Sequence, residues 1–211
     1  RTGVYYRLIL EHIHKVLAEI RRVYPDYDAK AGYELAGFVW FQGWNDMVDG
    51  STYPTRGQPG SYDAYSKNLA HFIRDVRRDL KAPKLPFVIG VMGAGGPIAK
   101  YGPDQKRYAG IHGEFRKAMA APAKLPEFKG NVTAVFTENY WDLQLSELVN
   151  RNGKVNAKRR ELSKDKTLTR EQCDKAVSEF TAKLFTKREL KILEVGTSNA
   201  AYHYLGSAKI L

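Results

Sequence analysis

The fold class of this chain is decided by the stretch Phe38-Val39-Trp40-Phe41-Gln42-Gly43-Trp44-Asn45-Asp46. An apolar run that ends in Gly-Trp-Asn-Asp predicts a buried strand that opens into a loop, because glycine lets the backbone turn sharply. In an open α/β sheet, ligands bind just beyond the carboxyl ends of the strands. An Asn45 amide placed there could donate to a developing oxyanion. A strand followed by an ordinary polar turn would show the same residue types, since Asn and Asp are common turn formers.

Helices and strands alternate on both sides of this stretch. Amphipathic patterns predict helices over residues 4–24, 62–80 and 103–120, and apolar runs predict strands over residues 35–41, 87–92 and 131–137. Strands that are apolar throughout and alternate with helices imply a parallel sheet that is covered on both faces. The sequence therefore predicts an α/β fold, a three-layer α/β/α sandwich with a mainly parallel sheet.

Two glycine-rich segments are predicted to be loops. Residues 50–60 form a loop that could be part of a site wall. Gly90 to Gly96 follows the second strand, but its spacing lacks the Gly-x-Gly-x-x-Gly fingerprint of dinucleotide sites. We therefore expect a flexible loop at the active edge of the sheet, and no nucleotide cofactor.

Composition and charge argue against several classes of protein. The net charge is +11, and residues 151–191 hold thirteen Lys and Arg against six Asp and Glu, a net of +7. Both signs mix there at helical spacing without interleaved stacking aromatics, so we expect a solvated helical region and no nucleic-acid binding. No stretch approaches the roughly 18 apolar residues of a membrane-spanning helix. The single cysteine, Cys173, excludes an intrachain disulfide framework.

A second group of chemically useful residues lies near the C-terminus, from Gly196 to Ser207. His203 follows a polar loop and starts a predicted terminal helix, a position from which a general base can reach a nucleophile on a neighbouring strand end. A surface or helix-capping histidine is the alternative. No spacing among the five histidines suggests a metal site, and no metal is expected.

Together these blocks resemble the SGNH, or GDSL-type, hydrolases, and within them the sialate O-acetylesterase-like carbohydrate esterases. The family block Gly-x-Asn-Asp is matched by Gly43-Trp44-Asn45-Asp46, and the block Trp-x-Gln-Gly by Trp40-Phe41-Gln42-Gly43. The segment His203-Tyr204-Leu205-Gly206 is similar to the catalytic-histidine block. The resemblance covers most of residues 4–145 and 192–211, and it implies an SGNH-hydrolase fold of the flavodoxin-like type.

The resemblance implies a serine esterase that removes acetyl groups from a carbohydrate, without a cofactor, in a secreted or periplasmic protein. It assigns His203, Asn45 and Gly43 to catalysis, and Gln42, Trp44 and Asp46 to substrate binding. Trp44, Tyr53 and Tyr101 are candidates for stacking on a sugar ring, although packing roles would suit each of them as well. An inactive carbohydrate-binding or scaffold protein of the same fold is the alternative.

Two departures from the family pattern bear on catalysis. The block that carries the nucleophilic serine is expected upstream of Arg1, or on another chain. We therefore expect residues 1–211 to form a single domain that lacks its N-terminal part. We also expect this domain to carry a basic helical insertion at about 150–190. Ser198 is the alternative nucleophile, because Gly196-Thr197-Ser198-Asn199 also resembles the family's Gly-x-Ser-Asn block. An upstream serine is preferred because the residues after Ser198 match the histidine block. The family places an orienting acid three residues before the histidine, where this chain has Ala200. That change suggests a Ser-His dyad, a backbone carbonyl as orienter, a carboxylate from elsewhere such as Asp142 or Glu138, or lost activity.

Overall fold

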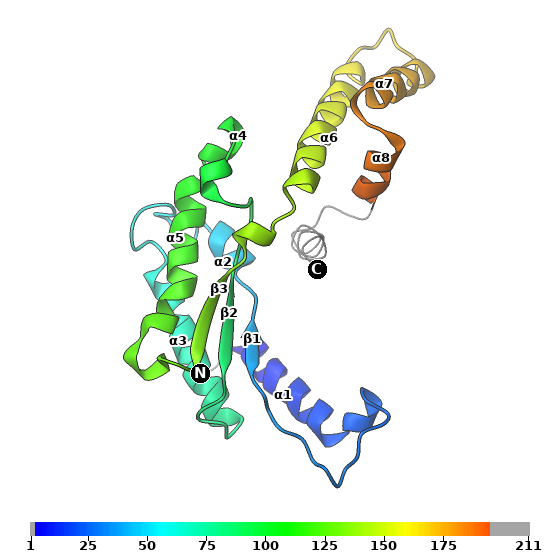
Figure 1. Cartoon of the computed structure of the whole chain (residues 1–211). Coiled ribbons are helices and arrows are strands. Elements are labelled where there is room, and N and C mark those ends of the chain that lie inside the picture. The colour runs from blue at the N-terminus through cyan, green and yellow to red at the C-terminus, as the bar shows by residue number, and fades with distance from the viewer. Residues whose placement is uncertain (1–2, 195–211) are drawn as a thin grey trace.

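The computed structural model describes residues 3–194 of the 211-residue chain. The strands in this part are β1 (Phe38–Trp40), β2 (Phe87–Val91) and β3 (Val132–Phe136) (Figure 1). The helices are α1 (Val4–Ala18), α2 (Trp44–Val48), α3 (Asp63–Asp79), α4 (Pro103–Lys106), α5 (Ala109–Ala120), α6 (Leu143–Leu162), α7 (Arg170–Leu184) and α8 (Lys187–Glu194). Short 3-10 turns are η1 (Ile20–Arg22), η2 (Ile98–Lys100), η3 (Ala121–Lys124), η4 (Pro126–Phe128) and η5 (Glu138–Tyr140).

The strands form a parallel sheet in the order β1-β2-β3. Trp40 lies beside Ile89, and Ile89 lies beside Ala134, so the carboxyl ends of all three strands meet at one edge. Parallel neighbours need a crossover connection, and helix α3 supplies it between β1 and β2, as α5 does between β2 and β3. The predicted fold class, an α/β fold with a parallel sheet of the SGNH-hydrolase type, is confirmed.

The hydrophobic core lies between the sheet and the two helices α3 and α5, which pack on the same side of it (Figure 1). Strand β2 is central, and its Phe87, Ile89 and Val91 are at most 1% exposed. Ile73 of α3 and Phe115 of α5 are fully buried against them. Each such side chain contributes about 1.5–3 kcal/mol through its removal from water. The packing of α3 and α5 on the sheet therefore fixes the position of the carboxyl ends of its strands.

The prediction that residues 35–41 form a fully buried strand is wrong. Strand β1 spans only Phe38–Trp40 and lies at an edge of the described sheet. Phe38 and Trp40 pack on Phe72 of α3, with ring centroids 5.7 and 4.5 Å apart, whereas Val39 is 70% exposed and Phe41 is 51% exposed. Successive side chains of a strand point to opposite faces, so an apolar run does not by itself show that both faces are covered.

Helix α1 begins where the sequence predicts but leaves its apolar side unburied. It ends at Ala18 and is followed by η1, and no residue of α1 is buried. Its anchor is Tyr6, whose ring lies edge-on to Phe72 at 5.8 Å and whose hydroxyl donates to Asp79 at 2.6 Å. Leu8 is 51% exposed. Amphipathic spacing thus predicted the helix correctly, but not that its apolar face would stay outside the core.

Helices α6, α7 and α8, here called the helical unit, extend away from the sheet (Figure 1). The unit has its own small core of Leu148, Val155, Val177 and Phe185. Arg151 ties its elements together, since it donates to Leu184 O at 2.8 Å and to Glu189 Oε1 at 2.6 Å. The predicted basic helical region is confirmed as helical, and its status as an insertion stays a prediction.

Candidate functional site

The chain leaves β1 through Gly43 in a backbone conformation that only glycine adopts readily. Gly43 has φ +151°, and a Cβ atom at this position would lie 2.8 Å from the ring of Phe115. Any other residue would strain the backbone and collide with a fully buried aromatic ring. Because Gly43 makes this turn, the chain passes directly from the carboxyl end of β1 into α2, which begins at Trp44.

The polar side chains of this block lie at the carboxyl end of β1. Trp44 is 40% exposed, Gln42 and Asn45 are also exposed, and Asp46 is half-buried. The Gln42 Nε2 amide donates to Asp46 Oδ2 at 3.2 Å, which holds the two side chains together. An amide donor and a carboxylate are therefore held together at the edge of the sheet where α/β proteins bind ligands, and an exposed tryptophan adjoins them in sequence.

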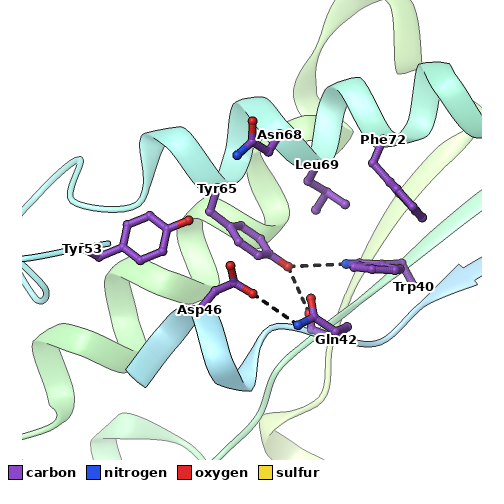
Figure 2. Close-up of a pocket in the computed structure, with 8 residues that line it drawn as sticks. All are labelled: Trp40, Gln42, Asp46, Tyr53, Tyr65, Asn68, Leu69 and Phe72. Atoms are coloured by element: carbon purple, nitrogen blue, oxygen red, sulfur yellow. Dashed lines mark hydrogen bonds between the residues drawn. The ribbon is translucent and has the colours of Figure 1, made fainter. Parts of the chain in front are cut away.

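A pocket of about 240 Å³ lies beside this block, against α3 (Figure 2). Its lining residues are Trp40, Gln42, Asp46, Tyr53, Tyr65, Asn68, Leu69 and Phe72. Four of the eight lining residues are aromatic, and two amides and one carboxylate converge on the pocket, which is the usual composition of a small-molecule site. Two of the predicted substrate-binding residues, Gln42 and Asp46, belong to this pocket, and Trp44 and Asn45 are not among its lining residues.

Tyr65 of α3 holds the end of β1 in place. Its hydroxyl donates to Gln42 O at 3.0 Å and accepts from Trp40 Nε1 at 3.4 Å (Figure 2). Burial raises the pKa of Tyr65 well above its usual value, so the hydroxyl keeps its proton at neutral pH. The helical pattern predicted that Tyr65 faces inward, but it could not show that the hydroxyl would bind the backbone of Gln42.

The predicted wall of the site, residues 50–60, is held by three side chains. The Tyr62 hydroxyl donates to Met47 O at 2.7 Å, and burial raises the pKa of Tyr62 to about 12. Arg56 Nη1 donates to Val48 O at 2.6 Å. Tyr53 is 5% exposed and its ring lies 5.0 Å from that of Tyr62. The loop after α2 is thus bonded to the block that it adjoins.

A second loop at the same edge follows β2, and Arg116 of α5 anchors it. The guanidinium, on a residue only 5% exposed, donates to Met92 O at 3.0 Å, Ala94 O at 3.0 Å and Gly96 O at 2.9 Å. The predicted loop from Gly90 to Gly96 therefore exists, but three hydrogen bonds from one buried cation restrain it. Arg116 was not singled out from the sequence, because a basic residue in an amphipathic helix usually faces solvent.

His112 lies next to this anchor. Its Nδ1 atom is 2.6 Å from the Tyr101 hydroxyl, and its ring stacks on Tyr108. Burial, and then the charge of Arg116, lower the pKa of His112 to about 4, so the ring is neutral at pH 7. Tyr101 is 7% exposed and donates to Ala94 O, so its ring is enclosed by protein and offers little surface to a sugar.

Residues 3–194 contain neither a metal-ligand cluster nor a membrane-spanning helix. Within this range, no group of three or more His, Cys, Asp or Glu side chains could hold a metal ion. No helix in the described part is long and apolar enough to cross a lipid bilayer. Cys173 is half-buried on α7, with its Sγ atom 3.6 Å from Leu162 O.

One family of known proteins matches the chain over most of its length. The model of a family described as carbohydrate esterase, sialic acid-specific acetylesterase, matches residues 14–182. The chain belongs to this family. The resemblance to sialate O-acetylesterase-like carbohydrate esterases is thereby confirmed. No curated protein and no solved structure matches the chain.

The family match includes the whole block from Gln42 to Asp46 of this carbohydrate esterase. The match also runs through most of the basic region at about residues 150–190, whose status as an insertion stays a prediction. His203, Ser198 and Ala200 lie outside the described residues, so the meeting of His203 with Asn45 stays a prediction. The structure thus gathers the predicted residues around Gly43 at one edge of the sheet.

Two carboxylates named as possible orienters in this esterase follow β3. Asp142 is 4% exposed, and its Oδ1 atom accepts the N–H of Leu145 at 2.9 Å, which caps the N-terminus of α6. Glu138 lies 3.5 Å from Arg116 Nη1, and its Oε2 atom is buried without a hydrogen bond among the described residues. Both acids therefore lie after the carboxyl end of β3, and Glu138 has the guanidinium of Arg116 beside it.

Proposed function

We propose that this protein hydrolyses acetyl esters on a sugar or polysaccharide by a Ser-His mechanism with Asn45 as oxyanion donor. The observation that carries the proposal is the family match across the Gly43-Trp44-Asn45-Asp46 block, together with the exposed Asn45 amide at the carboxyl edge of the sheet. The neighbouring pocket, lined by Gln42 and Asp46, would receive part of the sugar. A binding role for Trp44 rests on its exposed indole.

In the proposed reaction, a serine hydroxyl attacks the acetyl carbonyl carbon while His203 removes its proton. The Asn45 amide donates to the tetrahedral oxyanion, an interaction typically worth about 3 kcal/mol. The ester C–O bond then breaks, and His203 returns the proton to the departing sugar oxygen. Water attacks the acetyl-serine by the same route and releases acetate, which restores the serine.

The serine itself is proposed to come from a segment upstream of Arg1 or from another chain. This assignment rests on the order of blocks in the family, in which a Gly-x-Ser block precedes the Gly-x-Asn-Asp block. Labelling of the full-length protein with a fluorophosphonate, followed by peptide mapping, would identify the reactive serine. Labelling at Ser198 instead would overturn the upstream assignment.

The activity test uses the full-length protein with O-acetylated sialic acid and acetylated xylan as substrates. Asn45→Ala should lower kcat by about 10²–10³-fold, since one oxyanion donor is lost. His203→Ala should abolish turnover, whereas His14→Ala, a change at an exposed histidine of α1, should not alter it. Unchanged turnover in His203→Ala would eliminate the proposed base.

Ala200, which stands where the family has an acid, favours one other function: a carbohydrate-binding protein of the same fold without chemistry. That protein would bind an acetylated glycan in calorimetry and release no acetate.

We further propose, from the family alone, that the protein is secreted or periplasmic. Fractionation of the source cells followed by immunoblotting checks this.

A further inference from the structure

We propose that the pocket beside Gln42 and Asp46 binds an uncharged sugar ring, and that the charge of Asp46 selects against sugars that carry a carboxylate. This inference rests on the proposed function and names the class of sugar that the esterase accepts. The family description names sialic acid, which is an acidic sugar, so the charge of this pocket decides whether that sugar suits this chain.

The charge of the pocket is the first argument. Among the residues that the structure describes, its lining holds one acid, Asp46, and no Lys, Arg or His. Burial, and then the negative charge of Asp46, raises the pKa of Tyr53, and Asp49 at the end of α2 acts on this ring in the same direction. A sugar carboxylate bound here would therefore meet charges of its own sign without a cation to compensate them, which weakens binding.

Arg56, in the adjoining loop, does not supply that cation. Its Nη1 atom donates to Val48 O at 2.6 Å and to Met47 O at 3.5 Å, and Arg56 is not among the lining residues of the pocket. The guanidinium therefore holds the loop that follows α2, on the backbone of residues 47 and 48.

The apolar side of the pocket is the second argument. Trp40 and Phe72 are half-buried, and their ring centroids lie 4.5 Å apart. Trp40 Nε1 donates to the Tyr65 hydroxyl at 3.4 Å, which fixes the orientation of the indole (Figure 2). The C–H face of a sugar ring is apolar, so it can pack on an aromatic side chain and be removed from water.

The polar side of the pocket is the third argument. The Asn68 side chain of α3 has no hydrogen-bond partner within residues 3–194, and its amide can both donate and accept. Asp46 and the Gln42 carbonyl oxygen are acceptors. Sugar hydroxyls donate and accept, so they match this set without a charge. The volume of about 240 Å³ is below the roughly 300–1,000 Å³ of pockets for drug-sized ligands, so it suits one sugar ring.

The direct test is a binding titration with N-acetylneuraminic acid and its carboxamide analogue, which differ in charge and contain no ester. Fluorine NMR of full-length protein with 5-fluorotryptophan locates the ligand through the Trp40 signal, which Trp40→Phe assigns. At pH 7 the carboxamide should shift this signal and bind about 10–100-fold more tightly than the acid, because like charges repel.

Two pairs of variants test the assigned residues. Asp46→Asn keeps the size of the side chain and removes its charge, so the preference for the carboxamide should shrink to about 3-fold or less. Asp174→Asn, the same change on α7 of the helical unit, should leave the preference as in wild type. Asn68→Ala should weaken binding of the carboxamide by about 5–10-fold, since a hydrogen bond is lost. Ser66→Ala, on the same helix but not in this pocket, should not weaken it.

The outcomes separate this inference from the proposed function. Equal binding of acid and carboxamide by wild type, or a preference that survives Asp46→Asn, overturns the inference, and the proposed function stands if acetylated sugars are still hydrolysed. A preference that Asp46→Asn removes, in a protein without esterase activity, overturns the proposed function and supports the assigned pocket. If the carboxamide, N-acetylglucosamine and xylose all leave the Trp40 signal unchanged, the pocket does not bind a sugar ring and the inference is overturned.

Discussion

Replacing Gly43 by alanine tests whether the turn after β1 requires glycine. The backbone at φ +151° is strained for any residue with a Cβ atom, which costs about 1–3 kcal/mol. The added methyl would lie 2.8 Å from the fully buried Phe115 ring, and such overpacking costs about 1–3 kcal/mol more. The expected loss is therefore about 2–6 kcal/mol in the free energy of unfolding.

Thermal unfolding followed by tryptophan fluorescence measures this loss, because Trp40 and Trp44 flank the turn. At about 2–4 °C per kcal/mol for a chain of this size, Gly43→Ala should melt about 5–20 °C below wild type. Gly153→Ala is the matched control: this glycine lies inside α6, and nothing lies within 4 Å of the added methyl. That change should stabilise the protein by about 0.5–1 kcal/mol.

The reasoning about Gly43 has a clear refutation. If Gly43→Ala melts within about 2 °C of wild type, the close approach to Phe115 is not present in solution. A destabilised Gly153→Ala would show instead that alanine substitutions lower stability for a reason unrelated to backbone conformation.

Two further predictions concern the anchors of the fold. Arg116→Met removes three hydrogen bonds to backbone carbonyls and should cost about 2–4 kcal/mol in urea unfolding. The neighbouring Lys117 is exposed and pairs with Glu114, so Lys117→Met is the matched control. This control should change stability by less than about 0.5 kcal/mol. Equal urea midpoints for the two variants would contradict the anchoring role of Arg116. The pKa of Glu189 is lowered to about 2 by hydrogen bonds from the Thr186 backbone, Arg151 and the Thr186 hydroxyl. Because this folded-state pKa lies below the unfolded one, its stabilisation is present above about pH 4.3 and is lost as the pH falls toward 2. Circular dichroism should show the helical unit melting more easily in that window, and Glu189→Gln should flatten this dependence.

The alternation of helices and strands, and the block around Gly43, followed from the sequence alone. Helix α3 and strand β2 show periodicities of their own, because side chains three or four positions apart share a helix face and apolar runs suit buried strands. The candidate site residues Gln42, Trp44, Asn45 and Asp46 could be named because two family blocks hold them next to one another in sequence, and their roles stay predictions. The bond of Tyr65 to Gln42 O could not, since it joins positions 23 residues apart.

Only the tertiary structure decided which apolar surfaces are buried and which polar groups find partners. Val39 belongs to an apolar run and is 70% exposed, whereas Arg116 and Asp142 carry charges and are 5% and 4% exposed. Hydrophobic periodicity depends on residues that are close in sequence, so it can be detected in a single sequence. Burial and hydrogen bonding depend on which distant segments pack together, and a pattern of nearest neighbours does not contain that information.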